Sequence, residues 1–86
     1  MNKIIWQPKA LRQLRKIQDE KTQEQIFQEV QTLKAFPNCA NVKRLTNHTY
    51  GYRLRVGGYR IFFDFQGGEA RIVSIEEVKK RDEHTY

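Results

Sequence analysis

The sequence predicts an α+β fold, in which two helices pack on one face of a small, twisted, mainly antiparallel sheet in the order β-α-α-β-β-β. Three observations support this. Apolar residues recur at helical spacing between residues 8 and 36, they alternate with polar residues between 50 and 75, and two Gly-Gly pairs interrupt the alternating part. A chain of 86 residues has room for one hydrophobic core, so residues 1–86 are expected to form a single domain.

The first half of the chain is expected to form a short strand and two helices. Lys3–Gln7 alternates as a strand does, and Pro8 suits the first turn of a helix, where its missing N–H costs nothing. Thr22 and Gln25 fit a capping box at the start of a second helix, which Pro37 closes. The apolar stripe of that helix consists of Ile26, Phe27, Val30 and Leu33. Two short helices with a brief connection should pack antiparallel.

Three strands are expected in the second half, after a polar loop from Asn38 to Thr49. They are roughly residues 50–56, 59–66 and 70–75, with turns at Gly57-Gly58 and Gly67-Gly68. With two-residue turns, Asp64 would face Arg71, and Phe63 would lie beside Ile72. The segment after residue 75 is too polar to join a core along its whole length.

The first of these turns places Arg55 directly opposite Arg60, with Arg53 on the same face. Like charges facing each other destabilise a sheet by about 0.2–1 kcal/mol. A bound anion would compensate, since guanidinium groups offer bidentate hydrogen bonds to phosphate oxygens. A plain solvated arginine face is the other interpretation. The facing pair and the net charge of +6 favour phosphate binding, with nucleic acid as the expected polyanion.

Three apolar residues, Phe62, Val73 and Ile75, are predicted to share this cationic face. Apolar side chains exposed on a sheet usually have a partner. They would stack nucleobases, receive the apolar stripe of a partner's helix, or be covered by the C-terminal segment of the chain itself. The sequence leaves these alternatives open.

Several classes of site and location are disfavoured by composition. A lone cysteine excludes an internal disulfide framework and indicates a reducing compartment, and no apolar run approaches the length of a membrane span. The sequence has no metal-ligand spacing and no glycine-rich phosphate loop. We therefore expect a cytoplasmic protein without a metal or other cofactor and without membrane association.

The order of elements, with the segments YGYRLRVGGYRIFFDF and RIVSIEEVKKRDEHTY, resembles the RelE/ParE superfamily of bacterial toxins from toxin–antitoxin pairs. It looks most like the RelE-type members carried by phages and plasmids. This resemblance implies an mRNA endoribonuclease that enters the vacant A site of the ribosome, cuts the codon there and so inhibits translation. Cleavage would proceed by attack of the ribose 2′-OH on its own 3′ phosphodiester, without a metal. Another branch of the superfamily implies a ParE-like inhibitor of DNA gyrase. A plain RNA-binding module without catalysis is the remaining alternative.

The resemblance also implies roles for particular residues. The positions that match the active-site hairpin and tail of the family are Arg53, Arg55, Arg60, Arg81 and Tyr86. Known cleaving members carry lysines where this chain has Arg53 and Arg55, and an arginine cannot accept a proton as a general base. These two are therefore expected to bind the substrate, while Arg60 and Arg81 stabilise the negative charge on the phosphate in the transition state. Proton transfer then falls to Tyr86, His84 or Glu83.

Further contacts with mRNA and ribosomal RNA phosphates are expected from Lys43, Arg44, Lys79 and Lys80. The expected protein partner is a cognate antitoxin with an acidic, apolar segment, which would cover Phe62, Val73 and Ile75. The two proteins together would bind their own operator.

Overall fold

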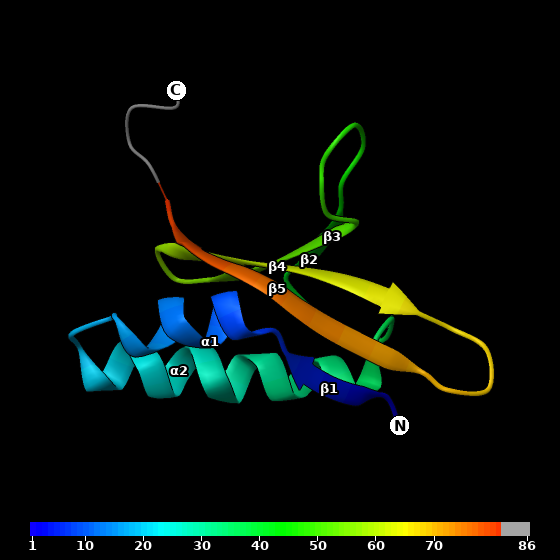
Figure 1. Cartoon of the computed structure of the whole chain (residues 1–86), viewed down its shortest axis with the longest axis horizontal. Coiled ribbons are helices and arrows are strands. Elements are labelled where there is room, and N and C mark those ends of the chain that lie inside the picture. The colour runs from blue at the N-terminus through cyan, green and yellow to red at the C-terminus, as the bar shows by residue number, and fades with distance from the viewer. Residues whose placement is uncertain (82–86) are drawn as a thin grey trace.

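The computed structural model describes residues 1–81 of the chain. Its elements are β1 (Lys3–Trp6), α1 (Pro8–Arg15), α2 (Glu20–Gln31), the 3-10 helix η1 (Thr32–Ala35), β2 (Val42–Arg44), β3 (Tyr52–Val56), β4 (Tyr59–Gln66) and β5 (Ile72–Lys80). The strands form one sheet in the order β1-β5-β4-β3-β2, in which only β1 and β5 are parallel. The helices lie on one side of this sheet (Figure 1). The predicted α+β architecture is therefore confirmed, with one strand more than expected.

The helices begin where local chemistry caps them. Pro8 is the first residue of α1, as expected. The predicted capping box at Thr22 is wrong, because the N-cap of α2 is Asp19. One oxygen of the Asp19 carboxylate accepts a hydrogen bond from the Lys21 N–H, and the other accepts one from the Thr22 hydroxyl. An aspartate satisfies the free N–H groups of a first turn well, so the N-cap lies three residues earlier than the predicted one at Thr22.

The core lies between the helices and the sheet. It consists of Ala10, Leu14, Ile26, Val30, Leu33, Phe36, Leu54, Val56, Ile61, Phe63, Val73, Ile75 and Val78. Phe27, which was predicted to join the stripe of α2, is instead 45% exposed and stacks on Trp6, with 6.3 Å between the ring centroids. It follows Ile26 directly, so it points about 100° away from the buried stripe. No helix in residues 1–81 is long and apolar enough to cross a membrane.

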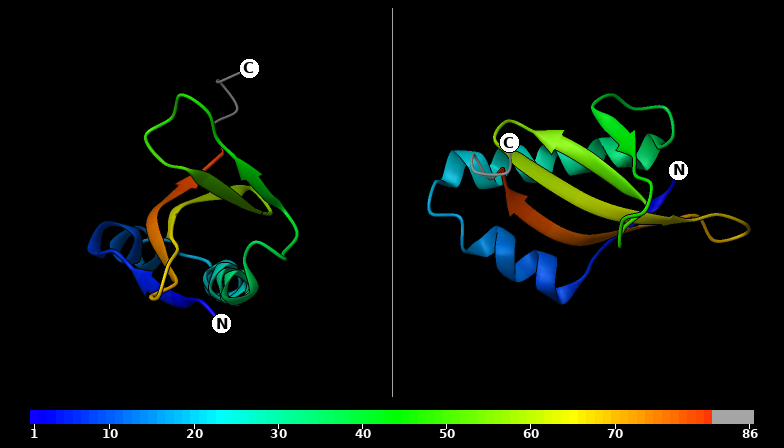
Figure 2. Two further views of the ribbon diagram at one scale, coloured as in Figure 1. Left: turned by 90° about the vertical axis from the view of Figure 1, so that its right-hand side faces the viewer. Right: turned by 90° about the horizontal axis from the view of Figure 1, so that it is seen from above.

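The missed strand, β2, falls inside the segment that was expected to be a loop. Val42 pairs with Leu54 and Arg44 with Tyr52, which makes β2 one of the two edge strands of the sheet. Three residues are too few to show an alternating pattern in the sequence. The connection from β2 to β3 is closed by a hydrogen bond from the Leu45 N–H to the Gly51 carbonyl. This β2–β3 loop rises from the sheet on the side away from the helices (Figures 1 and 2).

The register between β4 and β5 differs from the predicted one. Residues 67–71 connect the two strands, so the connection is longer than a two-residue turn, and Phe63 pairs with Ile75 instead of Ile72. Asp64 accordingly faces Ser74 and not Arg71. The observed partners thus lie three positions further along β5 than the predicted ones. Because neighbouring side chains of a strand point to opposite faces, a shift by an odd number places each β5 side chain on the face opposite to the predicted one.

The shift corrects the placement of Val73 and Ile75. Both are fully buried in the core under the helices, so they do not lie on the cationic face and do not offer a surface to an antitoxin. A bulge then changes the register again between Phe62 and Phe63, where the partner changes from Glu77 to Ile75. The bulge reverses the alternation, so β5 buries Val78 in the core while Glu77 faces the other side. β5 extends to Lys80, farther than the polarity of this segment suggested.

Candidate phosphate-binding site

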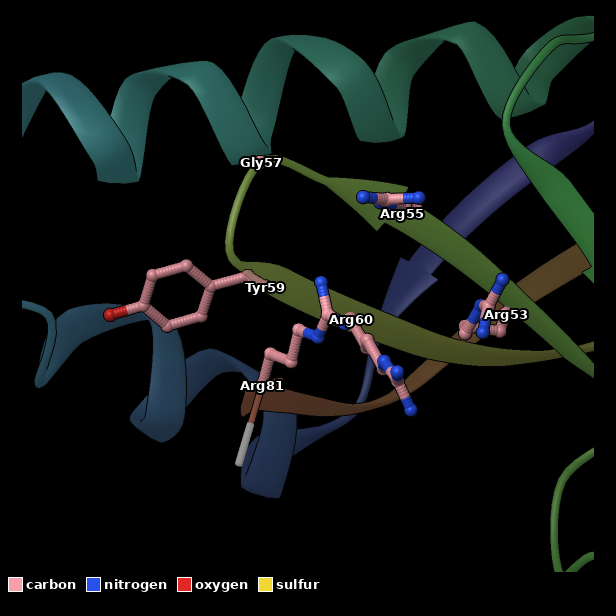
Figure 3. Close-up of a pocket in the computed structure, with 6 residues that line it drawn as sticks. All are labelled: Arg53, Arg55, Gly57, Tyr59, Arg60 and Arg81. Atoms are coloured by element: carbon pink, nitrogen blue, oxygen red, sulfur yellow. The ribbon is translucent and has the colours of Figure 1, made fainter. Parts of the chain in front are cut away.

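The face of the sheet turned away from the helices, called the open face below, carries a pocket of about 250 Å³. Its lining consists of Arg53, Arg55, Gly57, Tyr59, Arg60 and Arg81 (Figure 3). We call it the arginine pocket. Two of its guanidinium groups come from β3, one comes from β4, and the fourth belongs to the residue directly after the end of β5. The Tyr59 ring points away from the four arginine side chains (Figure 3).

Strand pairing brings these arginines together. Arg55 and Arg60 are direct partners across the β3–β4 turn, as the sequence predicted. Gly57 in that turn has a φ of +54°, a conformation that favours glycine. The N–H of Arg81 donates a hydrogen bond of 2.8 Å to the carbonyl of Gly58, which places Arg81 beside the same turn. The predicted assembly of Arg53, Arg55, Arg60 and Arg81 at one place is thus what the structure contains.

The arginine pocket contains an unsatisfied donor. The Nε atom of Arg53 is buried and has no hydrogen-bond partner in the described part of the chain. A buried N–H without a partner costs about 1–3 kcal/mol, and more when the group is charged. Such a group calls for an explanation, but its burial keeps it from contacting a ligand in the pocket directly. It is the gathering of four guanidinium groups that indicates an anion at this place.

The four other basic residues that were predicted to contact phosphates separate into two sets. Lys43 pairs with Arg53 and Lys79 with Arg60, so both lie on the open face next to the arginine pocket. Their sequence neighbours Arg44 and Lys80 pair with Tyr52 and Tyr59 and follow the alternation to the opposite face. Two other predicted site residues, His84 and Tyr86, lie outside the described residues together with Glu83.

Phe62 lies on the open face, as predicted, but the β2–β3 loop covers it. Its ring is stacked under that of His48, with 5.1 Å between the centroids and an interplanar angle of 13°. The Tyr50 ring lies 5.7 Å from Phe62 at 34°, and Phe62 is only 8% exposed. Hence neither the C-terminal segment nor a partner is needed to cover it. Sequence reasoning missed this role of His48 and Tyr50; the one available signal is their position in a short aromatic-rich segment, HTYGY.

A buried carboxylate anchors this loop to the sheet. Glu77, which is 8% exposed, accepts a hydrogen bond of 3.0 Å from the Tyr50 hydroxyl and one of 3.5 Å from Gln13. The Nζ atoms of Lys9 and Lys79 lie 3.5 and 3.8 Å from its Oε1. Burial alone raises the pKa of Glu77, but the two hydrogen bonds and the two ammonium groups outweigh it and hold that pKa below its usual value.

The same contact acts on Tyr50, whose pKa is raised by burial and by its hydrogen bond to the Glu77 carboxylate. A second anchor lies at the end of the loop, where the Gly51 N–H donates a hydrogen bond of 2.7 Å to Asp64. These contacts connect the β2–β3 loop to both β4 and β5. The loop is therefore held in a defined position beside the arginine pocket.

Helix α1 completes the surroundings of Glu77. Because β1 pairs only with Ile72–Ile75, the rest of that edge of β5 meets α1. There the side chain of Gln13 accepts a hydrogen bond of 2.7 Å from the Val78 N–H while its amide reaches Glu77. In residues 1–81, no group of three or more His, Cys, Asp or Glu side chains is placed to hold a metal ion. The open face thus offers fixed cations and one buried, neutralised carboxylate.

Comparison with known proteins agrees with this architecture. Residues 4–84 match a family model described as the ParE toxin of the type II toxin-antitoxin system, parDE. A solved structure of a YoeB/ParE toxin from Agrobacterium tumefaciens is similar, with a TM-score of 0.74 over 93% of this chain and 99% of that one. At 15% sequence identity, this similarity concerns the fold alone. No curated protein sequence matches the chain.

Proposed function

The chain belongs to the ParE toxin family of type II toxin–antitoxin systems, within the RelE/ParE superfamily, and we propose that it is an endoribonuclease that cuts mRNA in the ribosomal A site. The resemblance seen in the sequence is thereby confirmed at the level of the superfamily, and a toxin of this type implies a cognate antitoxin. One observation supports the nuclease in particular. Four arginines line one pocket: two come from β3, one comes from β4, and one directly follows β5.

The proposed reaction is an internal transesterification. The ribose 2′-oxygen attacks the adjacent phosphorus, the bond from phosphorus to the 5′-oxygen breaks, and the products carry a 2′,3′-cyclic phosphate and a 5′-OH. Negative charge builds up on the non-bridging oxygens as the 2′-oxygen attacks. Guanidinium groups stay protonated throughout, so Arg60 and Arg81 stabilise this charge while Arg53 and Arg55 hold the flanking backbone.

The reaction also moves two protons, one from the 2′-OH and one to the departing 5′-oxygen. None of the four arginines can accept a proton. We assign these transfers to His84 and Tyr86. Arg81 lies at the pocket, and His84 is the third residue after it in the sequence. Three residues in extended conformation span at most about 11 Å.

The antitoxin is proposed to neutralise the arginine pocket with an acidic segment. Charge complementarity supports this assignment, since the pocket presents four guanidinium groups. Phe62 is already covered by His48 and Tyr50, and Val73 and Ile75 are buried. The apolar contacts of the antitoxin therefore have to lie elsewhere on the toxin. Together with the antitoxin, the chain is proposed to bind the operator DNA of its own genes.

The test uses ribosomes programmed with a defined mRNA and an empty A site, with the same mRNA alone as the parallel sample. Primer extension maps the cuts. We expect cleavage within the A-site codon only on ribosomes, and a loss of about 10²–10³-fold in the cleavage rate for Arg60→Ala, the size typical of removing one donor to a developing oxyanion. Lys21→Ala, which removes an exposed cation from α2, is the matched control.

Two further variants separate the tail residues. If the Tyr86 phenol transfers a proton, Tyr86→Phe abolishes cleavage while ribosome binding persists. If the His84 imidazole transfers a proton, His84→Ala has the same effect. Unchanged cleavage in both variants would remove the proton-transfer assignment. Absence of cleavage by the unmodified chain, on ribosomes and on free mRNA, would overturn the nuclease itself.

The second candidate is inhibition of DNA gyrase without any RNA cleavage. The observation in its favour is that the matching family model is named for ParE, the branch of the superfamily that includes gyrase inhibitors. A supercoiling assay with purified gyrase distinguishes the two functions. Inhibited supercoiling together with intact mRNA would replace the nuclease by this candidate.

A further inference from the structure

The ring of His48 forms an exposed aromatic surface on the open face. One side of the imidazole lies flat on Phe62, at a centroid distance of 5.1 Å and an interplanar angle of 13°. Phe62 is buried by this contact, whereas His48 itself is an exposed residue. The other side of the imidazole is therefore turned to solvent. Aromatic side chains on which single-stranded bases stack present a flat ring in this way.

This surface adjoins the arginine pocket. Phe62, which carries the His48 ring, is the direct strand partner of Arg53, and Arg53 lines the pocket. Directly paired residues on one face of a sheet have Cβ atoms about 4.5–5.5 Å apart. A phosphate site and an aromatic surface thus lie side by side on the same face. This combination matches the two parts of a nucleotide.

The orientation of the His48 ring is held before any ligand arrives. The Tyr50 N–H donates a hydrogen bond of 3.1 Å to Nδ1 of His48, which fixes the direction of the ring. Tyr50 is in turn held by Glu77, and Gly51 by Asp64. A ring positioned by its own protein loses little conformational freedom on binding, which favours affinity.

We propose that His48 stacks on one base of a single-stranded RNA whose neighbouring phosphate lies in the arginine pocket. The inference rests on the proposed function, since it assumes that RNA occupies the pocket. The stacking role considered for Phe62 in the sequence thereby passes to His48, because Phe62 supports the stack from below. Stacking tolerates every base, so His48 contributes affinity and alignment and does not select one base by hydrogen bonding.

The test uses a trinucleotide RNA with 2′-O-methyl groups, which block the cleavage reaction, and the same trinucleotide with its middle base removed. NMR titration follows the two carbon-bound ring protons of His48, assigned by comparison with His48→Phe. We expect the intact trinucleotide to move these signals upfield, as a stacked base does, and the abasic one to leave them in place. Binding of the abasic RNA should be weaker by about fivefold or more.

Variants complete the comparison. His48→Phe keeps a flat ring, so this variant should still bind the abasic trinucleotide more weakly than the intact one. In His48→Ser, the difference between the two affinities should be smaller. Thr49→Ser, a conservative change in the same loop, is the control and should behave as the unmodified chain. His48 signals that do not respond to the intact trinucleotide would overturn the inference.

A further variant separates this inference from the proposed function. Arg55→Ala should weaken binding of both trinucleotides, because it removes a phosphate contact. If it does so while the His48 signals stay unchanged, RNA occupies the arginine pocket and only the stacking inference fails. If Arg55→Ala has no effect on either trinucleotide, RNA does not use the pocket and the proposed function fails as well.

Discussion

Arg55 of β3 and Arg60 of β4 face each other directly across the Gly57-Gly58 turn. The next residue across the sheet from Arg60 is Lys79, so three cations follow one another in a row on the open face. A sheet gains nothing from such a row by itself, because like charges in direct opposition repel. The arrangement is understandable if the face binds an anion, and its cost to stability can be measured.

Replacing Arg55 by threonine should stabilise the folded chain. The expected gain in the free energy of unfolding is about 0.2–1 kcal/mol, since the repulsion with Arg60 disappears. Urea unfolding at low ionic strength measures it. In 1 M salt, where the Debye length is about 3 Å, most of the gain should vanish. An equal gain at both salt concentrations would instead indicate the strand preference of threonine, and the charge argument would fail.

The salt dependence of RNA binding should change with the number of arginines. Each phosphate contact on a single strand contributes a slope of about −0.7 to a plot of log K against log salt concentration. Arg55→Ala should therefore make the slope shallower by about this amount, while Thr49→Ser, which changes no charge, should leave it unchanged. Fluorescence anisotropy with a labelled single-stranded RNA provides the binding constants. An unaltered slope in Arg55→Ala would exclude a phosphate contact at this residue.

The stability of the fold should depend on the ionisation of Glu77. Its pKa is held below the ordinary value of 4.5 in the folded chain, so its carboxylate contributes stability above pH 4.5. This contribution is lost as the pH falls through the lower folded pKa. We therefore expect the free energy of unfolding of the unmodified chain to exceed that of Glu77→Gln near pH 7, and the difference to shrink below pH 4.5.

Chemical unfolding at several pH values measures this difference. Glu24→Gln, at an exposed position of α2, is the matched control and should be close to neutral. A difference for Glu77→Gln that stays constant between pH 3 and pH 7 would contradict the role assigned to the Glu77 carboxylate.

A substitution at Ile75 tests whether this residue lies in the core or on a binding surface. It is fully buried, so Ile75→Ala should lower the free energy of unfolding by about 2–5 kcal/mol, through lost burial and the cavity left behind. Thermal and chemical unfolding measure the loss. Phe27→Ala removes an exposed ring from α2 and should cost clearly less. A near-neutral Ile75→Ala would indicate that the register of β5 is the one first predicted from the sequence.

The sequence was most informative where structure depends on near neighbours. The Gly57-Gly58 turn and the pairing of Arg55 with Arg60 were predicted correctly, because a two-residue turn determines the register of the strands beside it. Pro8 likewise marks the start of α1. The capping box at Thr22 was a local prediction that failed, since Asp19 three residues earlier competes for the same role.

The position of β5 required the tertiary structure. Its longer connection and its bulge shift the register twice, and each shift changes which side chains are buried. The alternating pattern alone assigned Val73 and Ile75 to the open face, whereas packing against the helices buries them. No local signal in the sequence specifies the number of residues in an irregular loop or the position of a bulge.

By itself, then, the sequence determined the α+β class and the arginine hairpin, because both depend on residue type and short-range spacing, and its resemblance to a known superfamily was confirmed by the family match. Only the tertiary structure decided that His48 covers Phe62 and that Glu77 is buried under Tyr50. These contacts join residues that are 14 and 27 positions apart in the chain. Their geometry results from the way the whole sheet pairs and packs, so it could not be read from any one segment.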